Sequence, residues 1–418
     1  MDQSGSGITG CGTAYALLHD DSPAASKLHI SVLEARGAVS GATGRNGGHL
    51  VSDADSLFGR IMNDHGLEQA KKVLYFSEAN MSRLKTLVSK LGHADREASE
   101  FRSVIASVGF TNSEMFGKMK SDIDVIRELN YRYRDIVGAI EQHGSGALSP
   151  YRLFTAVFNL LLDKFQDRFT LETNTPVTSI DYSQDDEYPY MLQTPRGLLR
   201  TRQVVHCTNG FSAYLTPHLC GKLWPVRGTM SVQEVGPLFP QLGSEISWTP
   251  LSPGSFNAET GVFSTGLYYA QQNPKTGHIW IGGDVQNISE MVATSDDSKI
   301  SPTSKANLES ILPRVLSESE PAHPIRVWSG IMGFTSDGMP YVGKLTSKMT
   351  GRQGHGEFIA AGFNGHGMDK AWLSGEAVAS LILHEKTTAG FPDIYLLNEE
   401  RFDKASSEQS ANAFLSLF

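Results

Sequence analysis

Cysteine is scarce in this sequence: only Cys11, Cys207 and Cys220 occur among 418 residues. No two of them have CxxC spacing, and three thiols do not make the even-numbered framework of small secreted domains. A reducing compartment is therefore expected. Because the sequence also lacks a signal peptide, an apolar run of roughly 20 residues and a peroxisomal C-terminal signal, the cytoplasm is the default location.

Positive charge is also scarce, because 45 acidic residues outnumber 36 basic ones and give a formal net charge of -9. With no dense Lys/Arg run, neither nucleic acid nor an anionic membrane is expected as a partner. The 13 histidines are scattered and form no HExxH or paired Cys/His motif, so no metal site is expected. The motif GxSxG is absent, which argues against a hydrolase serine. The length of the chain favours two domains.

Glycine, by contrast, is abundant, with 41 residues, and the first of them form a motif. Gly5, Gly7 and Gly10 spell GxGxxG, a helical pattern follows, and the run LHISVLEA predicts a strand that ends at Glu34. In a nucleotide-binding βαβ unit, glycine N–H groups and the helix N-terminus meet the pyrophosphate, and an acid after the second strand binds the ribose. The spacing predicts a dinucleotide site and leaves NAD and FAD equally open.

One part of that unit is missing from the sequence. Only four residues precede Gly5, whereas the motif normally follows an apolar strand in the middle of the sheet. The sequence therefore predicts either a protein that has lost this strand or a piece of a longer chain, and we favour the second.

Further patterns along the chain predict the remaining elements. The glycine-rich segment SGATGRNGGHL is expected to form a loop against a ligand, because bare backbone allows close approach. Charged and apolar residues alternate at helical spacing over 67–91 and 121–140, which predicts two surface helices. Short β-type runs from WPVRG to IWIGGDV predict an inserted antiparallel sheet, and EFIAAGFNGHGMDKAW predicts a strand, a glycine turn and a helix.

Eight motifs in order resemble the FAD-dependent D-amino-acid-oxidase superfamily: GSGITG, Glu34, ATGRNGGHL, ALSPYRL, CTNG, PVRG, MGFTSDGMPYVG and GFNGHGM. The glycine loop is most similar to the branch of gamma-glutamylputrescine oxidoreductase and the fungal FAD-dependent oxidoreductases, with sarcosine and glycine oxidases more distant. The resemblance implies an α/β fold: a Rossmann-type FAD-binding domain that lacks its first strand, with an inserted α+β antiparallel-sheet substrate domain. The FAD-binding domain would comprise residues 1–84, 145–224 and 326–418, and the substrate domain 85–144 and 225–325.

The cofactor implied by the resemblance is FAD, and the glycine loop after the second strand would curl around it. In such proteins a valine backbone meets the adenine, a turn after a central strand passes near the cofactor, and a C-terminal loop presents N–H groups to the N1/C2=O region of the flavin. The implied cofactor-binding residues are Gly5, Gly7, Ile8, Thr9, Gly10, Glu34, Ala35, Arg36, Thr43, Gly44, Arg45, Asn46, Gly47, Gly48, His49, Val177, Thr208, Asn209, Gly210, Gly333, Gly365, His366, Gly367 and Met368.

Departures from the family pattern carry information about the chemistry. Some relatives attach FAD covalently, but the two matching positions are Gly330 and Asn46, which have no suitable nucleophile, so FAD is expected to be non-covalent. Trp280 stands where sarcosine oxidases place a lysine for oxygen activation. Oxidase and dehydrogenase activity therefore both remain open.

The implied reaction is oxidation of a C–N bond of an amine or amino acid to an imine by hydride transfer to flavin N5. No catalytic side chain is identified, although His49 and His366 are candidates. The substrate candidates are Tyr268 and Tyr269, of which at most one is expected to face the site because strand neighbours point to opposite faces, and Asp369, which would suit a cationic amine.

Some readings stay open. Arg227 in PVRG has the chemistry to bind a carboxylate, but a structural ion pair is at least as well supported, so we assign it no catalytic role. The chain has two alternative functions: an NAD(P)H-dependent flavin hydroxylase or a non-catalytic flavoprotein remnant. The expected partner is a small amine or amino-acid substrate, and the sequence gives no indication of oligomeric state.

Overall fold

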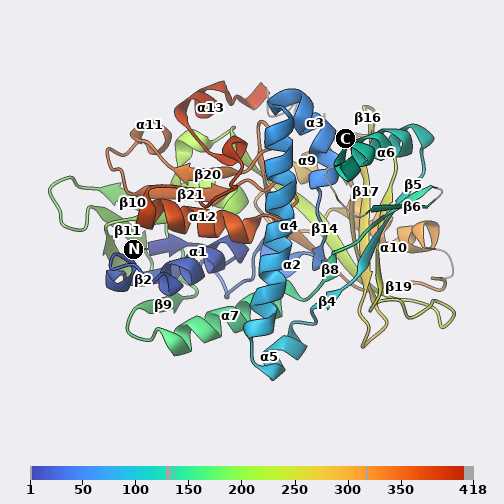
Figure 1. Cartoon of the computed structure of the whole chain (residues 1–418), viewed down its shortest axis with the longest axis horizontal. Coiled ribbons are helices and arrows are strands. Elements are labelled where there is room, and N and C mark those ends of the chain that lie inside the picture. The colour runs from blue at the N-terminus through green and yellow to red at the C-terminus, as the bar shows by residue number, and fades with distance from the viewer. Residues whose placement is uncertain (1, 129–132, 137, 317–318, 409–418) are drawn as a thin grey trace.

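Two large β-sheets form the framework of the protein. The computed structural model describes residues 2–128, 133–136, 138–316 and 319–408. In the view of Figure 1 the two sheets lie on either side of the long helix α4 (Leu67–Lys90). Within the described residues, every helix is too short or too polar to span a lipid bilayer.

The first sheet has six strands in the order β20-β21-β13-β1-β2-β9, and only β20 runs antiparallel to its neighbour. Helices α1 (Ile8–His19), α7 (Pro150–Lys164) and α12 (Ala371–His384) pack with it. Its strands are β1 (Asp2–Ser4), β2 (Ile30–Leu33), β9 (Phe169–Glu172), β13 (Val204–His206), β20 (Tyr341–Lys344) and β21 (Glu357–Ala361).

The structure corrects one sequence-based expectation about this sheet. The strand before the GxGxxG motif is present, although it has only three residues, Asp2–Ser4. It lies between β13 and β2 and pairs in parallel with both, Gln3 opposite Val205 and Val32. A few residues are enough because flanking strands on both sides satisfy their backbone groups.

The second sheet has nine strands and is mostly antiparallel, as the inserted-sheet prediction requires. Its path is β19-β14-β18-β17-β15-β5-β7-β6, with β16 paired to β17, and β15 runs parallel to β5. The strands are β5 (Ile105–Phe110), β6 (Tyr133–Ile136), β7 (Ala139–Gln142), β14 (Leu223–Glu234), β15 (Ile246–Leu251), β16 (Ser255–Asn257), β17 (Val262–Gln272), β18 (Ile279–Asn287) and β19 (His323–Thr335).

Smaller elements complete the chain. Two three-stranded sheets consist of β10 (Ser179–Tyr182), β11 (Tyr190–Thr194) and β12 (Gly197–Thr201), and of β3 (His49–Leu50), β8 (Gly146–Ala147) and β4 (Arg102–Ser103). The other helices are α2 (Ala42–Arg45), α3 (Ala54–His65), α5 (His93–Ala98), α6 (Ser113–Glu128), α8 (Ser212–Leu215), α9 (Ile288–Met291), α10 (Pro302–Val315), α11 (Ser347–Thr350) and α13 (Glu399–Lys404), with 3-10 turns η1 (Ala25–Lys27), η2 (Asn209–Phe211), η3 (Pro217–Leu219) and η4 (Asp393–Tyr395).

One of the two predicted surface helices is correct and the other is wrong. α4 covers the predicted segment 67–91 almost completely and buries residues at helical spacing, such as Val73, Ser77 and Leu84. In the segment 121–140, the helix α6 ends at Glu128, and β6 and β7 then form part of the nine-stranded sheet. β7 pairs with β5, which supplies hydrogen-bond partners for its backbone, and the helical pattern of the sequence gave no indication of this pairing.

Helices α1 and α12 pack closely because glycine occupies the contact in each. A Cβ at Gly12 would lie 2.8 Å from the carbonyl oxygen of Trp372, and one at Gly375 would overlap the carbonyl of Thr9. The hydroxyl of Thr13 donates to the carbonyl of Gly375 across the interface (3.2 Å). This packing fixes the N-terminus of α1 relative to the segment that precedes α12.

A buried cluster of His206, Glu357 and Arg352 joins two strands of the six-stranded sheet. His206 on β13 and Glu357 on β21 are fully buried, and the ring of His206 contacts the Glu357 carboxylate through Nε2 (2.8 Å). Arg352 donates two hydrogen bonds to the same carboxylate (2.7 and 2.6 Å). Burial alone would raise the pKa of Glu357, but the Arg352 and His206 contacts outweigh it and lower the pKa to about 2.

Glu357→Gln is expected to destabilise the protein by about 3–5 kcal/mol, because it leaves the Arg352 guanidinium buried without its carboxylate. Urea unfolding monitored by circular dichroism measures the change. Glu187→Gln is the matched control: Glu187 also pairs with an arginine, Arg202, but both side chains are exposed, so at most about 1 kcal/mol is expected. Equal effects of the two substitutions would contradict this account of the cluster.

Candidate active site

The turn between β1 and α1 brings distant segments against the GxGxxG motif. Gly5 has φ +98°, and a Cβ there would lie 2.7 Å from the carbonyl oxygen of Cys207, so only glycine fits. Gly7 is the N-cap of α1 and offers no side chain, and the N–H of Ile8 donates to the hydroxyl of Thr43 (3.0 Å). The N-terminus of α1 therefore faces the second glycine-rich segment.

Glu34 lies just after β2 and is partly buried. Its Oε2 accepts from the N–H and the hydroxyl of Ser6 (3.0 and 2.7 Å), and its Oε1 accepts from the N–H of Arg36 (3.1 Å). The carbonyl of Glu34 accepts from the N–H of Thr175 (2.8 Å), two residues before Val177. The structure thus brings the segment of Val177 beside the predicted ribose-binding acid.

The predicted loop that follows is not a loop throughout, because Ala42–Arg45 forms the single helical turn α2. Asn46 ends this turn: its side-chain amide donates to the carbonyl of Thr43 (3.1 Å), and its Oδ1 accepts from the N–H of Gly48 (2.8 Å). The same amide nitrogen lies 3.6 Å from the sulfur of Met368. Asn46 therefore links the second glycine-rich segment to the C-terminal segment Gly365–Met368.

Two asparagines, Asn209 and Asn364, connect the remaining segments that the sequence predicts to bind the cofactor. Oδ1 of Asn209, in the turn after β13, accepts from the N–H of Gly362 (2.9 Å). Oδ1 of Asn364 accepts from the N–H of Thr335 (2.9 Å), and its amide donates to the carbonyl of Gly362 (2.7 Å). The N–H of Asn364 also donates to the carbonyl of Gly333 (2.8 Å). The turns after β13, β19 and β21 are therefore held as one unit.

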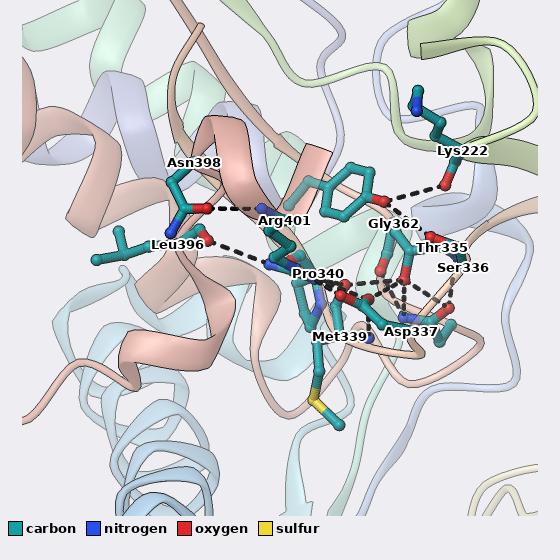
Figure 2. A network of polar contacts seen from close by, with 12 residues as sticks. Lys222, Thr335, Ser336, Asp337, Met339, Pro340, Gly362, Leu396, Asn398 and Arg401 are labelled. Atoms are coloured by element: carbon teal, nitrogen blue, oxygen red, sulfur yellow. Dashed lines mark hydrogen bonds and ion pairs between the residues drawn. The ribbon is translucent and has the colours of Figure 1, made fainter. Parts of the chain in front are cut away.

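Arg401 from the C-terminal helix α13 fastens the turn that follows β19 (Figure 2). Its guanidinium binds both carboxylate oxygens of Asp337 (2.6 and 2.9 Å) and the carbonyls of Met339 (2.6 Å) and Pro340 (2.8 Å). Burial would raise the pKa of Asp337, but the hydrogen bonds and charge of Arg401 hold it below the usual value. Asp337 thus remains an anion that orders the turn beside Thr335.

A buried charged cluster lies beside the C-terminal segment Gly365–Met368. Lys370 donates to Asp53 (2.8 Å) and lies 3.7 Å from Asp369, whose Oδ2 accepts from the hydroxyl of Ser77 (2.7 Å). Burial and the neighbouring Asp53 raise the pKa of Asp369 well above its usual value. The Asp369 carboxyl is therefore engaged inside the protein, and its predicted contact with substrate stays a prediction.

His366 lies at the edge of this cluster. Its Nδ1 is 3.3 Å from Oδ2 of Asp53, and 42% of its side chain is exposed. Asn80 on α4 holds the same region from the other side, because its amide donates to the carbonyl of Met368 (3.0 Å) and its Oδ1 accepts from the N–H of Leu373 (2.9 Å). These contacts orient the start of α12.

One face of the nine-stranded sheet lies against the glycines of the second segment. The amide of Gln271 on β17 donates to the carbonyl of Gly47 (3.0 Å), and Gln271 in turn accepts from Arg102. A Cβ at Gly47 would lie 2.8 Å from the methyl carbon of Met230 and 3.4 Å from the ring of Tyr269. The indole N–H of Trp328 donates to the carbonyl of Arg45 (2.7 Å).

His49 is held by this face of the sheet. Its Nε2 shares a hydrogen bond with the hydroxyl of Ser247 (2.7 Å), and its ring stacks with Tyr269 at a centroid distance of 6.4 Å. Burial, and to a lesser degree the charge of Arg102, lower the pKa of His49 to about 4. The imidazole is therefore neutral at ordinary pH.

The two candidate tyrosines lie on opposite faces of β17, as the alternation of a strand requires. Tyr269 faces Gly47 and His49, whereas Tyr268 packs into a hydrophobic cluster with Phe239 and Leu308. Sequence reasoning missed the residues that contact the backbone or the side chains of the site, since none belongs to a motif: Asp53, Asn80, Met230, Ser247, Gln271, Trp328 and Lys370.

Asp297 ties an exposed segment after α9 to the region of the second glycine-rich segment. Its carboxylate accepts two hydrogen bonds from Arg36 (2.8 and 2.9 Å) and lies 3.5 Å from Nε of Arg45. Arg45 also donates to the carbonyls of Ser40 (2.9 Å) and Ser329 (2.8 Å). The Asp297 side chain is only 9% exposed, so it fastens the segment 294–300 to the predicted cofactor residues Arg36 and Arg45.

Comparison with protein families matches residues 5–381 to the model described as FAD dependent oxidoreductase. The match spans nearly the whole chain, in agreement with the resemblance found from the ordered motifs. A search of curated proteins gave no match.

Solved structures of three enzymes share the fold. Glycine oxidase from Geobacillus kaustophilus has a TM-score of 0.70 at 20% identity, covering 95% of this chain and 98% of its own. L-proline dehydrogenase from P. horikoshii has a TM-score of 0.67 at 19% identity, covering 94% and 96%. L-amino acid deaminase from Proteus vulgaris has a TM-score of 0.65 at 17% identity, covering 94% and 92%. The fold class predicted from the sequence is therefore confirmed.

Asp297→Asn is expected to increase amide hydrogen exchange in the segment 294–300 by about tenfold, because it removes the charge that pairs with Arg36 and Arg45. Hydrogen–deuterium exchange with mass spectrometry measures it. Asp296→Asn is the control, since the neighbouring Asp296 bonds only within the segment, to Ser298 and Lys299. Unchanged exchange in the Asp297 variant would show that the contact does not hold the segment.

Proposed function

Because the chain belongs to the family of FAD-dependent oxidoreductases, we propose that it oxidises a C–N bond of a small amine or amino acid to an imine. When bound, FAD would supply the chemistry by accepting the hydride removed from the substrate carbon, which carries both electrons of the oxidation. The chain is an oxidoreductase by family, and the substrate class is the proposal. Family membership favours this reaction over a hydroxylase or a non-catalytic remnant.

The described residues fit FAD. At the N-terminus of α1, the first-turn N–H groups and the glycines of the motif offer donors and space for a pyrophosphate. Oε1 of Glu34 keeps a lone pair beyond its contact with Arg36, which suits a ribose hydroxyl, whereas Oε2 already accepts two hydrogen bonds from Ser6. Neither Gly330 nor Asn46 has a nucleophile, in agreement with the non-covalent FAD that is typical of this family.

We propose that FAD is held by the residues that the resemblance indicated, from Gly5 through Met368. The contact of Asn46 with Met368 supports this assignment, because it brings together segments 322 residues apart in the chain, and Asn209 and Asn364 join further predicted segments through Gly362. His366 and the N-terminus of α12 would face the polar edge of the flavin and stabilise negative charge there.

The observation that carries the proposed reaction is the part of the nine-stranded sheet against Gly47, where Tyr269 and Met230 present no charge. Tyr269, Met230 and neutral His49 line this face, and Ser247 fixes the imidazole. Such a surface suits a neutral amine, since a neutral nitrogen can release a hydride from its carbon without first losing a proton. In this arrangement Tyr269 positions substrate and His49 excludes water.

Three structures of similar fold support the substrate class. They are a glycine oxidase, an L-proline dehydrogenase and an L-amino acid deaminase, names that indicate amino-acid substrates. We further propose that residues 1–84, 145–224 and 326–418 form the FAD-binding domain and that 85–144 and 225–325 form the substrate domain. The six-stranded sheet draws only on the first set, whereas β14 and β19 cross the boundaries between the two.

Anaerobic mixing of the flavin-loaded protein with glycine, N-methylglycine, proline and putrescine tests the reaction. At least one of these C–N substrates is expected to bleach the visible flavin absorbance, and one imine product per flavin is expected by mass spectrometry. NADPH serves as the comparison. Bleaching by NADPH but by no amine would overturn the proposal in favour of a hydroxylase.

Gly47→Val is expected to abolish flavin binding, because the added carbons would meet Met230 and Tyr269 and close the space beside the loop. Glu34→Ala is expected to weaken it by about tenfold or more through loss of the ribose acceptor. Flavin content per chain after purification measures both. Gly37→Val is the matched control, since a Cβ at Gly37 meets nothing within 4 Å. Full flavin content in all three variants would refute the cofactor assignment.

The lowered pKa of His49 predicts a simple pH dependence. Since the imidazole becomes charged only below about pH 4, it contributes no ionisation to kcat/KM between pH 5.5 and 8. His49→Gln is expected to lower the rate while leaving the shape of the pH profile unchanged over this range. If the unchanged protein shows an ionisation near pH 6.5 and the His49→Gln variant does not, the assignment of a neutral His49 is contradicted.

A further inference from the structure

Arg227 in the motif PVRG is buried on the far side of the nine-stranded sheet. It lies on β14 and is 5% exposed. Side chains of a strand alternate between faces, so Arg227 and Thr229 share the face opposite to that of Met230, which contacts the glycine loop. The same face packs against α10, because Gln233 on it donates to the carbonyl of Leu308 (2.6 Å). Arg227 therefore points away from the candidate active site.

The guanidinium of Arg227 has no protein partner among the described residues. Its Nε is buried without a hydrogen bond, and no ion pair involves it there. Arg352, in contrast, is matched by the carboxylate of Glu357. An unpaired buried charge costs several kcal/mol, so a structural ion pair within the described chain does not explain Arg227.

Three further unpaired donors lie on the same face. Thr229 is directly opposite Ser329 in the pairing of β14 with β19, and the hydroxyl oxygens of both are buried without partners. Nδ2 of Asn307 on α10 is also unpaired, while its Oδ1 accepts from the hydroxyl of Tyr268 (3.1 Å). Residues directly opposite across two strands have neighbouring side chains, so the two hydroxyls lie together beside the arginine.

We propose that Arg227, Thr229 and Ser329 bind one small carboxylate anion between the nine-stranded sheet and α10. A guanidinium matches the two oxygens of a carboxylate, and two hydroxyls and the Asn307 amide can donate the remaining hydrogen bonds. One guanidinium supplies one positive charge, so a monoanion balances it. This second site is independent of the proposed oxidation, because β14 separates it from Met230 and the glycine loop.

Acetate binding to the whole protein tests the site. Sodium acetate replaces sodium chloride at constant ionic strength, and the midpoint of thermal unfolding is measured. The unchanged protein is expected to gain stability with acetate concentration as a single saturable site does. Arg227→Gln is expected to weaken the response about tenfold or more. Arg326→Gln on β19 is the matched control, because that arginine is exposed, and it is expected to respond like the unchanged protein.

Stability without acetate gives a second readout that does not need binding. Arg227→Gln is expected to match or exceed the unfolding midpoint of the unchanged protein in chloride, because it removes an uncompensated charge. A large loss of stability would instead mean that Arg227 has a protein partner, and would overturn the proposal. Thr229→Val keeps the charge and is expected to weaken acetate binding about two- to tenfold.

The chemistry of the anion and its source are tested with two further probes. In one series chloride replaces an inert salt, and in the other glycine replaces acetate. Each is added in increasing concentration to the unchanged protein and to the same variants. An equal Arg227-dependent response to chloride would overturn the carboxylate assignment. A response to glycine but not to acetate would make Arg227 part of an amino-acid site and overturn the assignment of a separate site. Response to acetate alone supports it.

Discussion

Side-chain amides that bind loop backbone are the interaction on which the candidate site depends. Segments rich in glycine have few side chains of their own, so their N–H and C=O groups need partners from elsewhere. Asn46, Asn209, Asn364, Asn80 and Gln271 supply them. An amide carries a donor and an acceptor on one rigid group, so each of these residues can hold two segments at once.

Charged side chains hold these glycine-rich segments and turns against the rest of the protein. Arg401 fixes the turn at Asp337, Lys370 joins Asp53 to the start of α12, and Arg352 joins two strands through Glu357. Lys370 and Arg352 meet carboxylates that are almost fully buried, which makes these contacts costly to break, whereas Asp337 beside Arg401 is 38% exposed. Arg227 differs from these buried cations because no carboxylate pairs with it among the described residues, and this difference is the reason for inferring a ligand.

The sequence predicted the fold well where local pattern and spacing are specific. The βαβ unit, the position of Glu34, the inserted antiparallel sheet and the strand-turn-helix near the C-terminus all follow from such patterns. It failed where pairing with distant residues decides the outcome. β1 has only three residues and depends on β2 and β13, and residues 139–142 form the strand β7 because β5 lies beside them. Gln271 and Asn80 carry no motif, since only their location gives them a role.

The longest strand pair of the protein has a mechanical consequence. β14 and β19 are 12 and 13 residues long, pair along almost their whole length, and extend from the turn at Asn209 to the region of α10. Both strands belong to the nine-stranded sheet, so bending that sheet across them would break consecutive hydrogen bonds of the ladder. The end of the sheet next to α10 and the end next to the turn at Asn209 are therefore held at a fixed spacing by the same pair of strands.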